Sequence, residues 1–203
     1  HKVCTAPSPD GKVSVEMVEA IVASHSSEHM VHPRLVYISD TTETGTVYTK
    51  AELTALRQCC DRHGLLLYLD GARLGCALTI PGADVTLSDL AALTDVFTIG
   101  GTKNGALFGE AVVLNTPCPR FRWHMKQRGA VLAKGRLLGL QFLAMFEKDL
   151  YMEMGHHADR LAMKIRQGLR EKGYRGRASP PWATSSAPTP PPTSNSPSCP
   201  TMW

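Results

Sequence analysis

The chain has 203 residues, of which 43% are hydrophobic and 20% are charged, and its formal net charge is +4. A chain of this length can bury a core and suits one domain. No apolar run approaches the length of a membrane span and no segment has the pattern of a signal peptide, so no membrane partner is expected. The mild charge does not indicate a nucleic-acid partner, because much of it lies on one predicted helix where a solvated face is the simpler interpretation. The basic residues of that helix are Arg120, Arg122, Lys126, Arg128, Lys134 and Arg136.

Cysteine and histidine patterns give little sign of a metal site or a disulfide framework. The chain contains no C-x-x-C pair; its cysteines are Cys4, Cys59, Cys60, Cys76, Cys118 and Cys199. Reduced thiols and a cytoplasmic location are therefore expected, with no metal. His25, His29 and His32 have near-helical spacing, but no cysteine lies near them, so surface positions are favoured over a metal site.

The first third of the chain alternates predicted helices and strands. Ser14 is a suitable N-cap for the first helix, and Thr49 with Glu52 forms a capping box for the second. Gly64 stands at the left-handed position that ends a helix. In chain order the predicted elements are a helix at 13–23, a strand at 34–39, a helix at 49–63 and a strand at 65–69. The order strand, helix, strand implies a right-handed crossover and parallel strands.

The pattern continues to about residue 172. Thr86 and Asp89 form a second capping-box-like start, for a short helix that runs to about Leu93. The remaining predicted elements are strands at 96–99 and 111–114, a long helix at 119–148 broken near Gly129 or Gly135, and a helix at 156–172. These elements predict an α/β fold with a mostly parallel sheet flanked by helices.

The composition changes abruptly after Arg177. Residues 178–203 contain no charged side chain and eight prolines. Such a segment cannot make a helix or a ladder and has too few apolar residues for a core, so it is expected to be disordered and without function. Two alternatives stay open: a proline-rich ligand through Pro188 and Pro191, or a frameshifted translation of a missing part.

Two reactive residues follow apolar strand-like runs. Asp70 ends the run 65–69 beside a glycine, and Lys103 follows the run 96–99 and two glycines. Parallel strands deliver such residues to the carboxyl edge of a sheet, where α/β proteins bind ligands, so both are expected at one edge, within reach of one small ring. Pyridoxal phosphate chemistry needs a lysine to form the Schiff base and an aspartate to keep the pyridine nitrogen protonated. On spacing alone, Asp70 serves equally well as a turn residue and Lys103 as a surface-loop lysine.

Several segments resemble the threonine aldolase and aromatic amino acid β-eliminating lyase family of fold type I pyridoxal phosphate enzymes. The resemblance rests on 68–75 and 99–110, supported by 44–49 and 125–129, and runs from about residue 1 to about 174. It implies a partial cofactor-binding large domain at 1–150 and the start of the link to a small domain at 151–177. The family's upstream phosphate-binding turn and ring-stacking residue have no counterpart here. The chain is thus expected to be a fragment that binds the cofactor weakly and cleaves threonine little or not at all.

The resemblance assigns roles to four residues. It implies that Lys103 and Asp70 are catalytic and bind the cofactor, that Thr102 contacts the cofactor phosphate, and that Arg73 holds the substrate carboxylate. The implied reaction cleaves a β-hydroxy-α-amino acid to glycine and an aldehyde, and β-elimination from an amino acid is the alternative. The implied partner is a small amino acid substrate, and the complete protein is expected to be a homo-oligomer.

Two other hypotheses compete. Asp40 ends a predicted strand and is followed by threonines, which is faintly similar to the haloacid dehalogenase pattern, with Asp40 as nucleophile, magnesium bound and Lys103 as the cation. That pattern needs a second aspartate where Thr42 stands. The other hypothesis is a non-catalytic remnant that folds poorly or serves as a partner.

Overall fold

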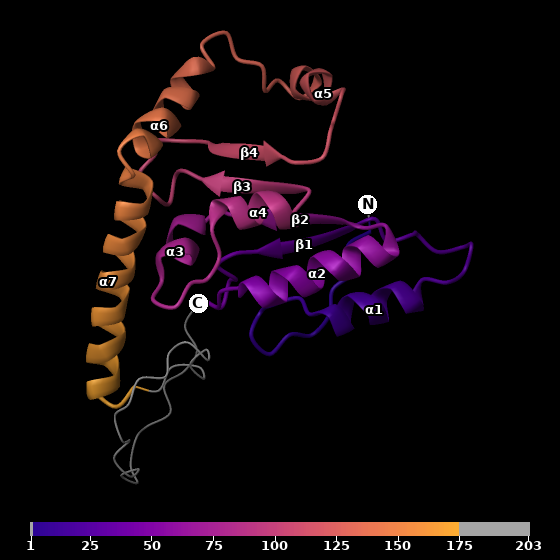
Figure 1. The fold of residues 1–203 in the computed structure, drawn as a ribbon, viewed down its shortest axis with the longest axis horizontal. Helices are drawn as coiled ribbons and strands as arrows, with labels where there is room; N and C mark the ends of the chain where they lie inside the picture. The colour runs from indigo at the N-terminus through magenta and orange to yellow at the C-terminus, as the bar shows by residue number, and fades with distance from the viewer. Residues whose placement is uncertain (1, 175–203) are drawn as a thin grey trace.

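Four short apolar runs pair into one sheet in the computed structural model, which describes residues 2–174. The strands are β1 (Leu35–Ser39), β2 (Leu66–Asp70), β3 (Val96–Gly100) and β4 (Glu110–Leu114), in the order β1-β2-β3-β4. The first three are parallel, and β4 runs antiparallel to β3 because only a short loop separates them. Figure 1 shows the four strands side by side with helices packed around them. The predicted α/β fold with a mostly parallel sheet is confirmed.

The helices begin where the sequence supplies side-chain caps. Ser14 accepts a hydrogen bond from the Met17 amide, and both capping boxes, Thr49 with Glu52 and Thr86 with Asp89, are formed. Gly64 ends the second helix with φ 62° and ψ 35°, as predicted. The helices are α1 (Val15–Ser24), α2 (Lys50–His63), α3 (Leu74–Thr79), α4 (Leu87–Leu93), α5 (Phe121–Gln127), α6 (Arg136–Glu147) and α7 (Leu150–Glu171).

The core lies on one face of the sheet. Alternate strand residues such as Ile38, Leu67 and Phe97 point to this face and are buried against α2, whose Leu53 and Leu56 are also buried. Helix α1 packs on α2 and extends this layer (Figure 1). Within the described residues, the opposite face exposes alternate apolar side chains, namely Leu35, Tyr37, Leu66, Val112 and Leu114. Strands β1, β2 and β4 are therefore more exposed on this face than on the core face, which differs from the buried strands expected of a parallel sheet, whereas β3 is buried on both faces from Phe97 to Gly100.

The structure corrects two predicted helix boundaries and adds one helix. The predicted break near Gly129 in the helix at 119–148 is confirmed, but it separates two helices, α5 and α6, because Gly129 adopts φ 73° and the chain leaves the helical path there. The six basic residues consequently spread over two helices and their linker. Helix α7 begins at Leu150, earlier than predicted, and the six-residue α3 was not predicted because it is too short for a periodic pattern.

Helix α7 packs against α3 through a pair of glycines, as seen beside the sheet in Figure 1. A Cβ at Gly155 would lie 2.6 Å from the Gly75 carbonyl oxygen and 2.7 Å from the Thr79 hydroxyl. Gly155→Ala is therefore expected to destabilise the fold by about 1–3 kcal/mol, since this overpacking pushes α7 from α3. Chemical denaturation of the purified chain measures the change.

Gly168 on the same helix provides the matched control. A Cβ there meets no atom within 4 Å, so Gly168→Ala should gain helix propensity, worth up to about 1 kcal/mol. Equal stability changes for the two variants would contradict the close α3–α7 contact.

The prediction of a disordered tail at 178–203 lies outside the described residues, and the domain boundaries near 150 and 177 stay predictions. Among the helices at 2–174, none has the combined length and apolar character that crossing a membrane requires.

Candidate active site

Asp70 is the last residue of β2 and faces the exposed side of the sheet. Its Oδ2 accepts a hydrogen bond from the Tyr37 hydroxyl on the neighbouring strand, and its Oδ1 accepts one from the Ala72 amide at 2.9 Å. The ring of Tyr37 stacks on that of Tyr68, with centroids 5.2 Å apart and planes 8° from parallel. The carboxylate is thus held in one orientation beside two aromatic rings.

Tyr37 acts as a hydrogen-bond donor to this carboxylate. Burial, followed by the hydrogen bond to Asp70, raises the pKa of Tyr37 to about 12. The hydroxyl therefore keeps its proton at neutral pH and can donate it to Asp70 Oδ2.

The strand ends of β2 and β3 meet directly after Asp70. The Gly100 amide donates to the Gly71 carbonyl at 2.9 Å, and the Gly71 amide donates to the Thr98 hydroxyl at 2.9 Å. A Cβ at Gly71 would lie 1.9 Å from the Thr98 carbonyl oxygen, so only glycine allows this approach. Asp70 and the loop that carries Lys103 therefore lie at the same edge of the parallel sheet, as predicted from the sequence.

Helix α7 holds the loop that carries Lys103. Asn104 is buried and its Nδ2 donates to the Tyr151 carbonyl at 2.8 Å, while the Tyr151 hydroxyl donates to the Gly100 carbonyl at 3.1 Å. Thr102 and Lys103 are exposed between these two anchors. Neither side chain makes a hydrogen bond or ion pair within residues 2–174, so the Lys103 amine is available to a ligand.

Arg73 follows β2 and pairs with Glu43, which lies in the turn after β1. Nη1 lies 2.9 Å from Oε1 and Nη2 lies 3.3 Å from Oε2, so the pair is bidentate. Arg73 lowers the pKa of Glu43; the charge of Lys103 lowers it further, and that of Asp70 opposes the shift. Glu43 follows β1, Asp70 and Arg73 lie at the end of β2, and Lys103 follows β3, so the four charged side chains lie along one edge of the sheet.

Two residues of this edge were not assigned roles from the sequence: Tyr37 and Glu43. The signal for Glu43 is its place in the turn after β1, at the same carboxyl edge as Asp70 and Lys103. Tyr37 gives no such signal, because its contact depends on the pairing of Tyr37 with Tyr68, which sets Asp70 beside it.

Asp40 does not have the surroundings of a nucleophile. It is only 2% exposed, and its Oδ1 accepts a single long hydrogen bond, 3.4 Å from the Tyr48 amide. Burial raises the pKa of Asp40 to about 7. A phosphate ester could not approach this carboxylate from solvent, which argues against the phosphotransfer hypothesis.

An open hollow of about 640 Å³ lies between the Lys103 loop and α7. Its walls include Lys103, Gly105, Glu153, Met154 and His157. Asp70 and Arg73 do not line it, so this hollow alone does not bring the three charged side chains together; the ends of β2 and β3 do.

The fold is that of the large domain of a fold type I pyridoxal phosphate enzyme. Residues 2–174 match the Beta-eliminating lyase family, whose members are known to use this cofactor, and the chain belongs to that family. The predicted resemblance is thereby confirmed.

Individual relatives agree. The chain is 32% identical to the low specificity L-threonine aldolase of Pseudomonas aeruginosa, over 79% of this chain and 47% of that protein. It is also 32% identical to the enzyme of the same name from a Pseudomonas species, over 81% of this chain and 48% of that protein. The chain spans about half the length of the curated relatives it matches.

Solved structures give the same result. A structure of Leishmania major threonine aldolase superposes with a TM-score of 0.85 at 50% identity, over 86% of this chain and 52% of that chain. The apo form of mouse CSAD superposes with a TM-score of 0.53 at 18% identity, over 81% of this chain and 37% of that chain, which is a likeness of fold alone.

Proposed function

We propose that this chain supplies the reactive lysine and the ring-nitrogen partner of a pyridoxal phosphate-dependent lyase. The enzyme would cleave threonine and related β-hydroxy-α-amino acids to glycine and an aldehyde. The observation that carries the proposal is the gathering of Asp70, Arg73 and Lys103 at one carboxyl edge of the sheet. The printed names of the relatives support threonine as the first substrate to test.

The residues present fit the cofactor. Lys103 has an exposed amine that contacts no hydrogen-bond or ion-pair partner within residues 2–174, so it would be the residue that holds the cofactor and could hold or move a proton at its Nζ. Asp70 is a fixed acceptor, and a carboxylate is the partner that keeps a pyridine nitrogen protonated. When bound, the cofactor supplies the electron sink for the cleaved bond. Thr102 is free to donate its hydroxyl to the phosphate.

Arg73 is proposed to bind the substrate carboxylate. A planar guanidinium suits bidentate binding of a carboxylate, and Glu43 occupies that position in this structure. The substrate carboxylate would replace Glu43 on Arg73, so only ligands with a carboxylate would gain this contact.

β-Elimination remains the alternative activity, because it uses the same lysine, aspartate and arginine. The products distinguish the two reactions: aldol cleavage of threonine gives glycine and acetaldehyde, whereas β-elimination gives 2-oxobutanoate and ammonia. The threonine aldolase names favour the first.

We propose further that the complete protein is a cytoplasmic homo-oligomer. Helix α6 exposes Leu137, Leu140 and Leu143 at every third position, an apolar surface that suits contact with another subunit. The cysteines within the described residues are free thiols, which agrees with a reducing compartment.

Reductive trapping tests the proposal on the 203-residue chain. The chain is incubated with pyridoxal phosphate, reduced with borohydride, digested and analysed by mass spectrometry. Because reduction captures even a weakly bound cofactor, the pyridoxyl group should appear on the Lys103 peptide well above the level on other exposed lysines such as Lys134. Even labelling of all exposed lysines would sink the assignment.

Two matched variants complete the test. Lys103→Ala should remove the selective label, whereas Lys134→Ala should leave it in place. Both lysines are exposed, so the loss of one positive charge is the same in each variant.

A further inference from the structure

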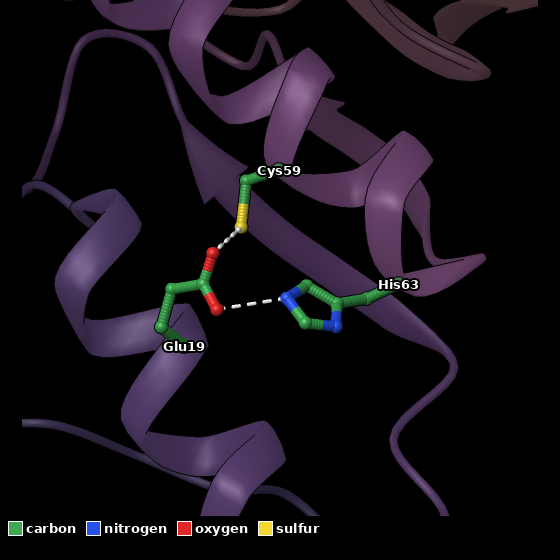
Figure 2. Close-up of side chains that lie close together, drawn as sticks. All are labelled: Glu19, Cys59 and His63. Atoms are coloured by element: carbon green, nitrogen blue, oxygen red, sulfur yellow. Dashed lines mark hydrogen bonds and ion pairs between the residues drawn. The ribbon is translucent and has the colours of Figure 1, made fainter.

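Three side chains of different chemistry meet between α1 and the C-terminal half of α2, away from the candidate active site. Glu19 comes from α1, and Cys59 and His63 come from α2 (Figure 2). Their ligand atoms, one carboxylate oxygen, one sulfur and one imidazole nitrogen, all lie within 4.8 Å of one another. None of these residues belongs to the candidate active site.

The packing of α1 on α2 creates this cluster. Cys59 and His63 are four residues apart, so they lie on one face of α2, one turn from each other. The Cys59 thiol donates to Glu19 Oε1 at 3.6 Å, and His63 Nε2 lies 2.8 Å from Glu19 Oε2. Glu19 therefore already bridges the two residues of α2, as the dashed lines in Figure 2 show.

We propose that Glu19, Cys59 and His63 form a binding site for Zn²⁺. Cysteine sulfur, histidine nitrogen and glutamate oxygen are the three ligand types that zinc takes in proteins, usually in tetrahedral geometry. Ligand atoms this close need only small side-chain adjustments to surround one ion. Water would complete the four ligands, as at zinc sites that keep an open position.

Access and charge are compatible with a cation. The side chains of Glu19 and His63 are 42% and 27% exposed, so an ion can enter past them to the buried sulfur of Cys59. On binding, the Cys59 thiol loses its proton to solvent, and the thiolate with the Glu19 carboxylate balances the double positive charge. Arg62 contacts Glu19 Oε1 at 2.8 Å, but its side chain is 55% exposed and can turn into solvent.

The competing explanation is an ordinary ion-pair network. In that case Glu19 simply joins α1 to α2 through Arg62 and His63, and no ion binds with useful affinity. The sequence gives little indication of a site, because Glu19 is 40 residues from Cys59 in the chain.

Titration of the purified, reduced 203-residue chain with Zn²⁺ tests the proposal, using a competing chromophoric chelator to measure affinity. One equivalent should bind at this site. Substitution with Co²⁺ should give the visible bands of tetrahedral coordination and a thiolate-to-cobalt charge-transfer band. Absence of saturable binding, or cobalt spectra without the thiolate band, would overturn the site.

Variants assign the ligands. Loss of a residue that only supports a metal ligand typically costs about 10–100-fold in metal affinity. Loss of a direct ligand should cost at least as much, so His63→Ala and Glu19→Gln should each weaken Zn²⁺ binding by about tenfold or more. Both side chains are partly exposed, so these variants are expected to fold even if Cys59→Ser does not. Cys59→Ser, where it folds, should abolish the charge-transfer band.

Two control variants exclude adventitious binding. His29→Ala removes a more exposed histidine, and Cys4→Ser breaks a second cysteine–histidine contact, 3.5 Å from Cys4 Sγ to His25 Nε2. Both should leave the affinity and the cobalt spectrum unchanged. If Cys4→Ser, rather than His63→Ala, lost the binding, the metal would belong to the other pair and the proposal would be wrong.

Discussion

Replacing Asp70 by asparagine is expected to weaken pyridoxal phosphate binding to this chain by about 10–100-fold. A hydrogen bond to a charged group contributes about 1.5–3 kcal/mol, and each 1.4 kcal/mol is about tenfold in affinity. The amide keeps the shape of the side chain but cannot balance a protonated pyridine nitrogen. The affinity is measured by equilibrium titration of wild type and variant with the cofactor.

Two further variants separate the contact from the charge. Glu147→Gln removes an exposed carboxylate from α6 and should leave the affinity unchanged. Tyr37→Phe removes the hydroxyl that occupies Asp70 Oδ2, so binding should be equal or tighter, because the ring nitrogen no longer competes for that oxygen. Unaltered affinity in Asp70→Asn would show that Asp70 is only a turn residue, the other role that its sequence context allowed.

Local signals in the sequence were sufficient to predict the starts of three helices and the sheet edge at which Asp70 and the Lys103 loop lie. Caps at Ser14, Thr49 and Thr86 lie where side-chain chemistry places them, because a cap needs only residues within one turn. Asp70 and the Lys103 loop reach one edge because parallel strands of similar length end together. Both inferences depend on short-range pattern and on one topological rule.

Contacts between segments that are distant in the chain could not be predicted from the sequence. Tyr37 meets Asp70 across 33 residues and Glu43 meets Arg73 across 30, and each pair depends on the register of β1 against β2. No local pattern encodes that register, since a shift of one residue would turn every side chain to the other face. The chemical roles of Lys103, Asp70, Thr102 and Arg73 remain predictions until the ligand experiments are done.

The break between α5 and α6 shows a different limit. Gly129 and Gly135 both interrupt the apolar pattern, and a single glycine inside a helix costs only about 1 kcal/mol, so the sequence could not decide between a kinked helix and two helices. The left-handed φ of 73° at Gly129 ends α5 in the structure. The exposed apolar face of the sheet likewise could not be foreseen, because apolar strand runs do not reveal what covers them.

Asp40 provides the second large expected effect, on stability rather than on binding. Burial, the largest cause, raises its pKa from 3.8 to about 7 in the folded chain. The folded state therefore holds the Asp40 proton up to higher pH than the unfolded state does. This contribution to stability is fully present below about pH 4 and is lost as the pH rises to about 7, where the charged carboxylate must be buried.

Asp40→Asn should remove that pH dependence. A shift of about 3 pKa units corresponds to roughly 2–4 kcal/mol after allowance for relaxation around a buried charge. Chemical denaturation at pH 5 and at pH 8 should therefore show the variant gaining stability relative to wild type at the higher pH. The prediction concerns how the stability difference between variant and wild type changes from pH 5 to pH 8. The difference at a single pH also includes the new hydrogen-bond donors of the amide, and the other titrating groups contribute equally to both proteins. Parallel behaviour of wild type and Asp40→Asn would mean that Asp40 is ionised in the folded chain at both pH values.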